Sequence, residues 1–399
     1  MRAITKMTTQ RIGDIAYVIP GRHLLGENHN TEQRGVPYIT GPSDFGVIQA
    51  TPSRWTEKPD AMCVSGDILI TVKGAGVGKL NFAPDVTTCI GRQIMGIRPH
   101  NNVVDSWYLY FAIKQQFKSI SGAATGATIP GLSIDQIAGI QMKVPPIASQ
   151  RRIASHLKGQ MSAVEQARQR VLDQLRHTEL LRLKYFLDAF DERELAGWTE
   201  RSLLDLAHVV SGMTLGGPVA KEPTTKVPYL RVANVKDGWL MLDDVKEIDA
   251  TARDIEQFQL RHGDVVLTEG GDPDKLGRGT VWRGEIGLCL HQNHIFRVRF
   301  DQAQVCPEFA AYQFASRHGK AYFLAHAKQT TGIASINKGV LSRFPFRLPP
   351  LATQRRIAAR LRGQFEHLQQ LKSALTDQLA ALDKLPGAYL REAFGRLED

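Results

Sequence analysis

The chain contains the sequence VPPIASQRRIASHL at residues 144–157 and a close copy, LPPLATQRRIAARL, at residues 348–361. Nine of these fourteen positions are identical at a constant offset of 204 residues. The match continues without a gap to DAF at residues 188–190 and EAF at residues 392–394. A repeat of this length in a chain of 399 residues indicates two copies of one structural unit.

Each copy predicts a long helix. The double proline suits the approach to a helix start, and Ser149 and Thr353 stand where an N-cap would accept the first free amides. The residues that follow are almost free of glycine and proline, and apolar residues recur at three- and four-residue spacing: Leu157, Met161, Val164, Val171 and Leu175 in the first copy and Leu361, Phe365, Leu368, Leu375, Leu379 and Leu382 in the second. This heptad seam, matched between the copies, favours two long helices that pair. The alternative is two amphipathic helices that each lie on their own domain.

Two features interrupt these seams. Arg168 and Lys372 occupy equivalent positions, one in each copy. A polar seam residue can fix the register of a helix pair, or its long stem can carry the charge out to water. The pair Pro386-Gly387, late in the second copy, predicts a break or kink, because proline removes a helical donor and clashes with the preceding turn.

The regions that precede the helices share short β-rich landmarks. GDILIT at residues 66–71 returns as GDVVLT at residues 263–268, and each is followed by a glycine-rich loop, 73–79 or 269–279. Each region then has a helical patch, 107–117 or 309–323, and a Thr-Gly loop before the double proline. The predicted organisation is a β-rich domain over 1–147, a helical region over 148–196, a second β-rich domain over 197–351 and a second helical region over 352–399. Because the helices agree in residues while the β-rich domains differ, we expect the domains to act on different targets.

With 43% hydrophobic and 23% charged residues, the chain has the composition of an ordinary globular protein. Its 399 residues are enough for two or three domains. No run approaches the ~20 apolar residues needed to cross a bilayer, and no signal-peptide pattern opens the chain, so we expect a cytoplasmic protein without a membrane role. The four cysteines form no CxxC pair, which fits a reduced compartment. A net charge of +10, spread over both halves, favours a polyanion partner.

The duplicated Pro-Pro-(Ile/Leu)-Ala-x-Gln-Arg-Arg-Ile motif, each time after a Gly-Asp strand and a Thr-Gly loop, resembles the specificity subunit of type I restriction–modification enzymes. The resemblance covers the chain from about Ile12 to about Phe394. It implies an α+β fold in which two β-rich target recognition domains are separated by two long helices. Those helices are expected to pack as an antiparallel coiled coil with internal pseudo-two-fold symmetry.

The resemblance also implies a function. Each domain would read one half of a bipartite, asymmetric site in double-stranded DNA, and two DNA methyltransferase (M) subunits would methylate adenine N6. S-adenosylmethionine would bind those partners, and restriction (R) subunits that use ATP and Mg could join the complex; the specificity subunit itself has no catalytic centre. The residues leave an alternative open, a DNA-independent scaffold or inhibitor protein built from two globular domains and a helical spacer.

Base and phosphate recognition needs cationic and amide side chains on loops that reach the grooves. The glycine-rich loops and neighbouring strand ends supply them, and we predict as DNA-binding residues Lys73, Lys79, Arg92, Arg231, Asn234, Lys275, Arg278 and Arg283. The competing interpretation is solvated hairpins with incidental charges. In each helical copy an arginine pair, Arg151-Arg152 and Arg355-Arg356, marks either a solvated face or a contact with the methyltransferase subunits.

Motifs for enzyme chemistry do not fit. KGAGVGKL at residues 73–80 lacks the leading glycine of a phosphate loop, and Leu80 stands where that loop needs Ser or Thr. Cys289, His291 and His294 could suggest a metal, but on a strand His294 would point away from the other two, so we expect packing instead. We therefore predict no catalytic residue and no metal site.

Overall fold

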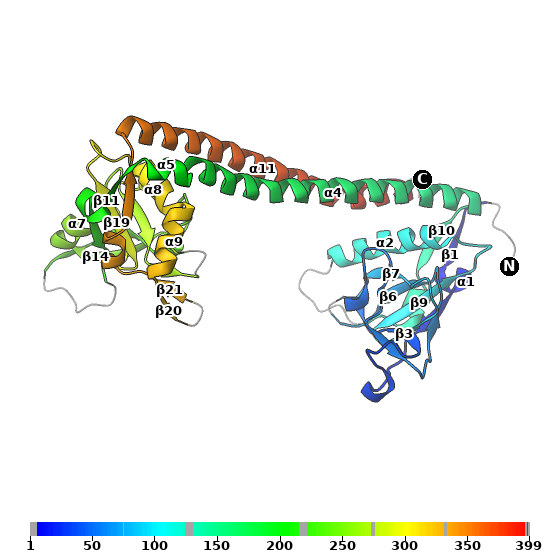
Figure 1. The fold of residues 1–399 in the computed structure, drawn as a ribbon. Helices are drawn as coiled ribbons and strands as arrows, with labels where there is room; N and C mark the ends of the chain where they lie inside the picture. The colour runs from blue at the N-terminus through cyan, green and yellow to red at the C-terminus, as the bar shows by residue number, and fades with distance from the viewer. Residues whose placement is uncertain are drawn as a thin grey trace. The chain divides into compact units, whose positions relative to one another are not determined.

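The computed structural model describes residues 6–74, 76–123, 131–214, 222–272, 276–330, 333–395 and 397. These residues form two compact units, Met1–Leu172 with Thr376–Asp399, and Asp173–Leu375. Each unit combines one β-rich domain with parts of both long helices (Figure 1). The units therefore cross the boundaries drawn from the sequence, because each helix contributes to both.

The first domain is built on two four-stranded sheets. One has the order β2 (Ala16–Pro20), β9 (Ile94–Pro99), β6 (Ile68–Thr71) and β7 (Leu80–Phe82), and the other β4 (Arg54–Thr56), β3 (Val36–Ile39), β8 (Thr88–Ile90) and β5 (Met62–Cys63). A third, two-stranded sheet pairs β1 (Thr8–Arg11) with β10 (Gln141–Val144). The helices are α1 (Ile12–Ile15), α2 (Ser106–Ala123) and α3 (Ile134–Ala138), with single turns at Gly26–Asn28 and Pro42–Asp44.

The second domain repeats the main sheet. Its order is β12 (Ala207–Ser211), β19 (Ile295–Phe300), β15 (Val265–Thr268) and β17 (Gly279–Val281). The other sheets are β14 (Lys246–Thr251), β13 (Thr224–Leu230) and β18 (Leu290–His291); β11 (Thr199–Ser202) with β22 (Pro345–Leu348); and β16 (Gly270–Gly271), β21 (Ile333–Ser335) and β20 (Lys328–Thr330). The helices are α5 (Glu192–Ala196), α6 (Leu203–Leu206), α7 (Ala252–Phe258), α8 (Pro307–Ala315), α9 (Arg317–His326) and α10 (Lys338–Ser342), with a single turn at Val232–Asn234.

The Gly-Asp pair that begins GDILIT and GDVVLT plays the same structural role in both domains. Gly66 and Gly263 each adopt φ +89°, a conformation that favours glycine. The aspartate that follows is almost fully buried and forms an ion pair with an arginine on the central strand, Asp67 with Arg98 at 2.7 Å and Asp264 with Arg299 at 2.6 Å. A turn and a buried charge pair thus fix the start of β6 and of β15, whose residues are all buried.

The two long helices are α4 (Ile147–Ala189) and α11 (Leu351–Gly395). In the first unit Arg168 of α4 bonds to Asp383 of α11, and in the second unit Glu179 of α4 bonds to Lys372 of α11. A second contact within each unit sets the direction. Leu157 of α4 shares a core with Leu390 of α11 in the first unit, and Phe186 of α4 packs against Phe365 of α11 in the second. In each unit residue numbers therefore rise on α4 as they fall on α11, and the pairing is antiparallel, as predicted. The matched seam positions Leu157, Val164, Val171, Leu361, Leu368 and Leu375 are all buried.

The helix pair also packs onto the domains, so the two interpretations of the seam both hold in part. Leu157 of α4 and Leu390 of α11 belong to the same hydrophobic core as Tyr108 of α2. In the second unit Phe186 of α4, Phe365 of α11 and Tyr312 of α8 form an aromatic cluster with ring centroids 5.0 to 6.2 Å apart. Each domain is thereby joined to both helices through apolar contacts.

The expected break at Pro386 and the expected single helix over 309–323 are both wrong. α11 is not broken at Pro386 but continues to Gly395, because Leu390 and Phe394 beyond the proline pack into the core of the first unit. That burial offsets the missing helical donor at the proline, which costs ~3 kcal/mol in an unsupported helix. The single patch expected over 309–323 is two helices, since Ser316 ends α8 and caps α9 through its Oγ.

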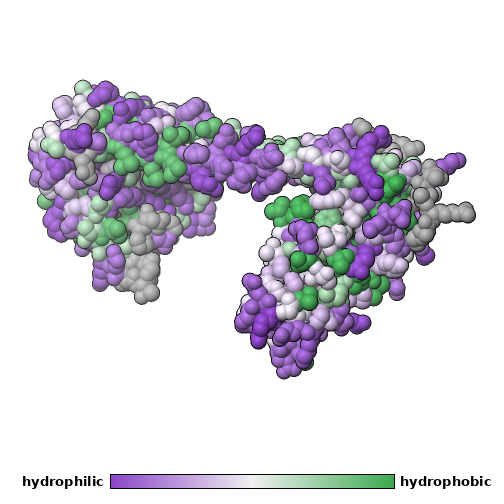
Figure 2. Space-filling view, turned by 45° about the vertical axis from the view of Figure 1, so that its right-hand side comes forward, coloured by the Kyte–Doolittle hydropathy of each residue, from purple (hydrophilic) through white to green (hydrophobic). Residues whose placement is uncertain are grey.

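Most of the surface in view in Figure 2 is hydrophilic, with small hydrophobic patches. All four cysteines are buried and unpaired. Among the described helices, none combines the length and apolar character that crossing a membrane requires.

Candidate nucleic-acid interface

Two predicted loops meet at one end of the main sheet in the first domain. Val72, at the start of the β6–β7 loop, donates its backbone N–H to the carbonyl of Gln93 in the β8–β9 turn at 2.8 Å. Lys73, Lys79 and Arg92 extend from these two loops and are exposed. None of the three side chains makes a hydrogen bond or ion pair with another described residue. They form a cationic surface that is available to a phosphate backbone.

The equivalent loops of the second domain meet in the same way but carry different chemistry. Glu269 donates its backbone N–H to the carbonyl of His294 at 2.9 Å, and its carboxylate accepts from His294 Nδ1 at 2.8 Å. By their backbone bonds Glu269 takes the place of Val72, and Asn293 the place of Arg92. A carboxylate and an amide therefore stand where the first domain has an aliphatic side chain and a guanidinium group.

Three of the predicted residues belong to the β15–β17 segment or lie just beyond it. Arg278 is half-buried, its carbonyl accepts from Thr268 N–H, and its buried Nε makes no hydrogen bond to a described residue. Arg283 is exposed and lines a groove of about 620 Å³ between the second domain and its part of the helix pair. Lys275 lies outside the described residues.

Two predicted residues serve the fold instead. Asn234 is 1% exposed, and its side chain accepts from Arg231 N–H and donates to the carbonyls of Met241 and Asp244. Three of its four hydrogen-bonding positions are filled inside the domain and the side chain is buried, so Asn234 is not accessible to a DNA base. Arg231 pairs with the Asp244 carboxylate at 2.8 Å, and this bond is the main reason that the pKa of Asp244 lies below its usual value. This arginine is already committed to holding a loop.

The sequence reasoning missed a β-hairpin. β20 and β21 pair with each other, and β21 also pairs with β16, whose two residues Gly270 and Gly271 have no side chains. Lys328 and Gln329 are exposed on β20, the outer strand of this sheet, which β21 separates from β16. A two-stranded ribbon fits the major groove, and glutamine is a common reader of adenine. The sequence contained a signal for it, since KQTTGIAS at residues 328–335 has β-prone residues on both sides of a Thr-Gly pair.

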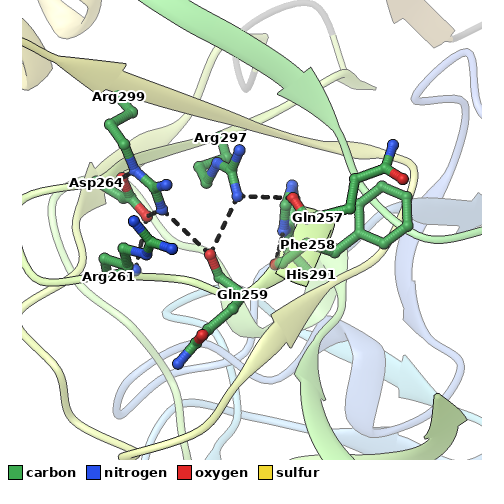
Figure 3. Close-up of polar contacts among 8 residues, drawn as sticks. All are labelled: Gln257, Phe258, Gln259, Arg261, Asp264, His291, Arg297 and Arg299. Carbon is green, nitrogen blue, oxygen red and sulfur yellow. Dashed lines mark hydrogen bonds and ion pairs between the residues drawn. The ribbon is translucent and has the colours of Figure 1, made fainter. Parts of the chain in front are cut away.

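Cys289 and His291 lie in the core of the second domain, whereas His294 is exposed at the loop end. His291 Nδ1 contacts the carbonyl of Phe258 at 2.9 Å, and Arg297 Nη1 donates to the carbonyls of Gln257 and Gln259 (Figure 3). These two buried side chains cap the C-terminal end of α7. Burial lowers the pKa of His291 to about 4 and that of Arg297 to about 10. Within the described ranges no group of three or more His, Cys, Asp or Glu side chains could hold a metal ion.

The motif arginines lie on the first turns of the long helices. Arg151, Arg152, Arg355 and Arg356 are exposed, and none of their side chains bonds to another described residue. These four charges therefore take part in no hydrogen bond or ion pair within the part of the chain that the structure describes.

Comparisons with known proteins agree with this architecture. The family model for the type I restriction modification DNA specificity domain matches residues 5–174 and 196–381. The putative type I restriction enzyme MjaX specificity subunit of Methanocaldococcus jannaschii is 32% identical over 35% of this chain and 33% of its own length. The StySPI specificity subunit of Salmonella potsdam is 23% identical over 75% of this chain and 66% of its own length. The chain thus spans one third to two thirds of the length of these relatives.

Two solved structures share the fold across nearly the whole chain. The HsdS subunit from Thermoanaerobacter tengcongensis has a TM-score of 0.62 at 18% identity and covers 99% of this chain and 98% of its own. A structure from work on assembly and conformational transition of the type I R-M system has a TM-score of 0.75 at 18% identity, with 99% of each chain covered. With the family model matched in both halves, this chain belongs to the type I restriction modification DNA specificity domain family.

Proposed function

We propose that the chain is the DNA sequence-recognition subunit of a type I restriction–modification complex, and that its two domains read the two halves of a bipartite, asymmetric site. The observation that carries this proposal is the pair of loop ends described above. They share backbone geometry, yet one presents Lys73 and Arg92 and the other Glu269 and Asn293. One scaffold with two sets of side chains, exposed in the first domain and half-buried in the second, suits two different base sequences.

In this proposal the exposed cations contact DNA phosphates. Residues of the β20–β21 hairpin and of the turn between β18 and β19 contact bases. Lys73, Lys79 and Arg92 supply positive charge on loops, Lys328 does so on β20, and Arg278 and Arg283 do so near β17. Gln329 and Asn293 are the candidate base readers of the second domain. The chain itself performs no chemistry in this proposal.

Methyl transfer to adenine N6 belongs to two methyltransferase subunits that bind S-adenosylmethionine. The exposed Arg151-Arg152 and Arg355-Arg356 pairs give the two helices matching surfaces for two copies of one partner. Exposed Leu180, Leu183 and Leu187, at helical spacing on α4, add an apolar stripe of the kind found at protein interfaces. Restriction subunits that use ATP and Mg would join the same complex.

The test is co-expression of the chain with a methyltransferase subunit in a host that lacks both, followed by sequencing of methylated adenines. We expect methylation at one bipartite motif, and none with either protein alone. Methyl transfer by the isolated chain would contradict the division of labour. The rival, a DNA-independent scaffold or inhibitor, predicts no salt-dependent DNA binding and no methylated motif in any combination.

A further inference from the structure

The glutamine of the duplicated motif makes an unusually complete set of contacts. Gln150, in the first turn of α4, is 0% exposed. Its Oε1 accepts the backbone N–H of Asp105 at 2.9 Å, and its Nε2 donates to the carbonyls of Val103 at 3.0 Å and Pro145 at 2.7 Å. One amide thus joins the helix, the double-proline segment before it and the loop that leads into α2.

The second unit repeats this arrangement bond for bond. Gln354, in the first turn of α11, is also 0% exposed. Its Oε1 accepts from Cys306 N–H at 2.8 Å, and its Nε2 donates to the carbonyls of Gln304 at 3.0 Å and Pro349 at 2.8 Å. The loop held here leads into α8, the counterpart of α2. The surrounding domains differ in sequence, so the repeated bonds point to a repeated task at the junction.

Only a primary amide can perform this task. The site needs one acceptor for a backbone N–H and two donors for backbone carbonyls, and asparagine is too short by one methylene to replace glutamine. A glutamate would place a carboxylate against two carbonyl oxygens, and an apolar side chain would leave three buried backbone groups unpaired.

A second contact on the same face of each helix follows eight residues later. Lys158 Nζ lies 4.2 Å from the centre of the Trp107 ring in the first unit, and Arg362 pairs with Glu308 at 3.9 Å in the second. Eight residues correspond to about 12 Å along a helix. Two polar contacts at this separation add direction-specific bonds to the apolar packing between each helix and its domain.

We infer that Gln150 and Gln354 are positioning residues that set the angle at which each long helix leaves its recognition domain, and through it the spacer length that the complex accepts between half-sites. This inference rests on the proposed function. It assigns the motif glutamines to the geometry of the target rather than to base reading.

The experiment uses the chain reconstituted with its methyltransferase subunit and a library of targets in which both half-sites are kept while the spacer varies. The variants are Gln354→Leu and Gln150→Leu, with exposed Gln378 changed to Leu as the matched control. We expect both variants to keep the two half-sites but to raise the ratio of methylation at neighbouring spacers to that at the native spacer by about fivefold or more, since leucine removes three hydrogen bonds and the loss of one alone corresponds to a change of about that size. Gln378→Leu should keep the native ratio.

An equal fall in methylation at every spacer, with the ratio unchanged, would overturn the inference and leave the glutamines a structural role alone. If the leucine variants do not fold, Arg362→Met and Lys158→Met remove the second, surface contact instead and should broaden the spacer preference in the same direction. An unchanged ratio in folded Arg362→Met and Lys158→Met overturns the inference as well. Failure of the proposed function looks different, because the unaltered chain would then methylate no spacer at all.

Discussion

Arg168 donates from Nε to the carboxylate of Asp383 at 3.2 Å, across the helix pair of the first unit. Adding the repeat offset of 204 to Arg168 gives Lys372, and subtracting it from Asp383 gives Glu179, which are the partners of the 2.7 Å bond in the second unit. The two seam-interrupting cations, for which the sequence left open a register device or a stem that carries the charge to water, therefore each meet an acidic residue of the other helix. The same ion pair is made twice by duplicated residues.

We predict that this ion pair selects register more than it adds stability. Arg168→Glu should lower the free energy of unfolding by roughly 0.5–1 kcal/mol, since both partners are partly exposed. The double reversal Arg168→Glu with Asp383→Arg should recover most of that stability. Urea unfolding of the four proteins in a double-mutant cycle measures the coupling, and Arg170→Glu, exposed on the same helix, is the control for a simple change of charge. Zero coupling would remove the pair as a register device.

Lys73→Ala and Lys79→Ala are expected to weaken DNA binding and to reduce the slope of log affinity against log salt by ~0.9 for each phosphate that is no longer neutralised. The matched control is Arg231→Ala, because that guanidinium is held by Asp244. The control should lower thermal stability but leave the salt slope of the folded protein unchanged. Fluorescence anisotropy at a series of salt concentrations measures the affinity and its salt slope. An unaltered slope in the double lysine variant would show that this loop does not contact DNA.

Gln329→Ala should relax base discrimination in one half-site without abolishing binding. A bidentate amide contact to a base contributes ~1–3 kcal/mol of discrimination, whereas a phosphate contact contributes none directly. Lys328→Ala, on the adjacent residue of the same strand, should instead weaken binding to all sequences alike. Sequencing of sites methylated by the reconstituted complex separates the two outcomes. If both variants keep the motif and the affinity, the hairpin does not contact DNA.

Buried His291 makes the second unit sensitive to acid. Its pKa in the folded state is about 4, below the ordinary value of 6.5, because burial disfavours the charged ring. As the pH falls below about 6.5 the unfolded chain binds the proton first, so the free energy of unfolding drops until about pH 4, by roughly 3 kcal/mol in total. Above about pH 7 this histidine adds no pH dependence.

The variant His291→Asn should therefore show a flatter decline of stability between about pH 6.5 and 4, although it is less stable at neutral pH because the bond to Phe258 is altered. His262→Asn, at an exposed histidine, should retain the steep decline. Urea unfolding at a series of pH values is the measurement. Parallel curves for the unaltered chain and His291→Asn would show that this ring is not held neutral.

A final prediction concerns length. Inserting one heptad after Asp173 in α4 and one after Asp377 in α11 keeps both seams in register. Seven residues add about 10 Å to a helix, close to three base pairs of DNA at ~3.4 Å each. We expect the half-sites to stay the same while the accepted spacer grows by about three base pairs, as read from methylated sites. An active variant with the native spacer would show that the helices do not set the distance.

The sequence predicted what depends on repetition and periodicity. Leu157 and Leu361 could be placed in a paired seam because apolar spacing and burial are directly linked. It did not predict the role of Asn234, since amide bonds to loop carbonyls depend on a backbone path that no local pattern encodes. The continuity of α11 through Pro386 was missed for a related reason. Local propensity opposes that helix, and only the tertiary packing of Leu390 and Phe394 overrides it.

The contact eight residues after each motif glutamine joins the same kind of helix group, a cation, to a different kind of group on each domain. The helix offers a cation both times, Lys158 or Arg362, while the domain offers the Trp107 ring or the Glu308 carboxylate. Either cation is attracted by either partner. A domain transplanted from one position in the chain to the other would meet a compatible helix. New target specificities could thus arise in this architecture by recombination of whole domains, without compensating substitutions in the helices.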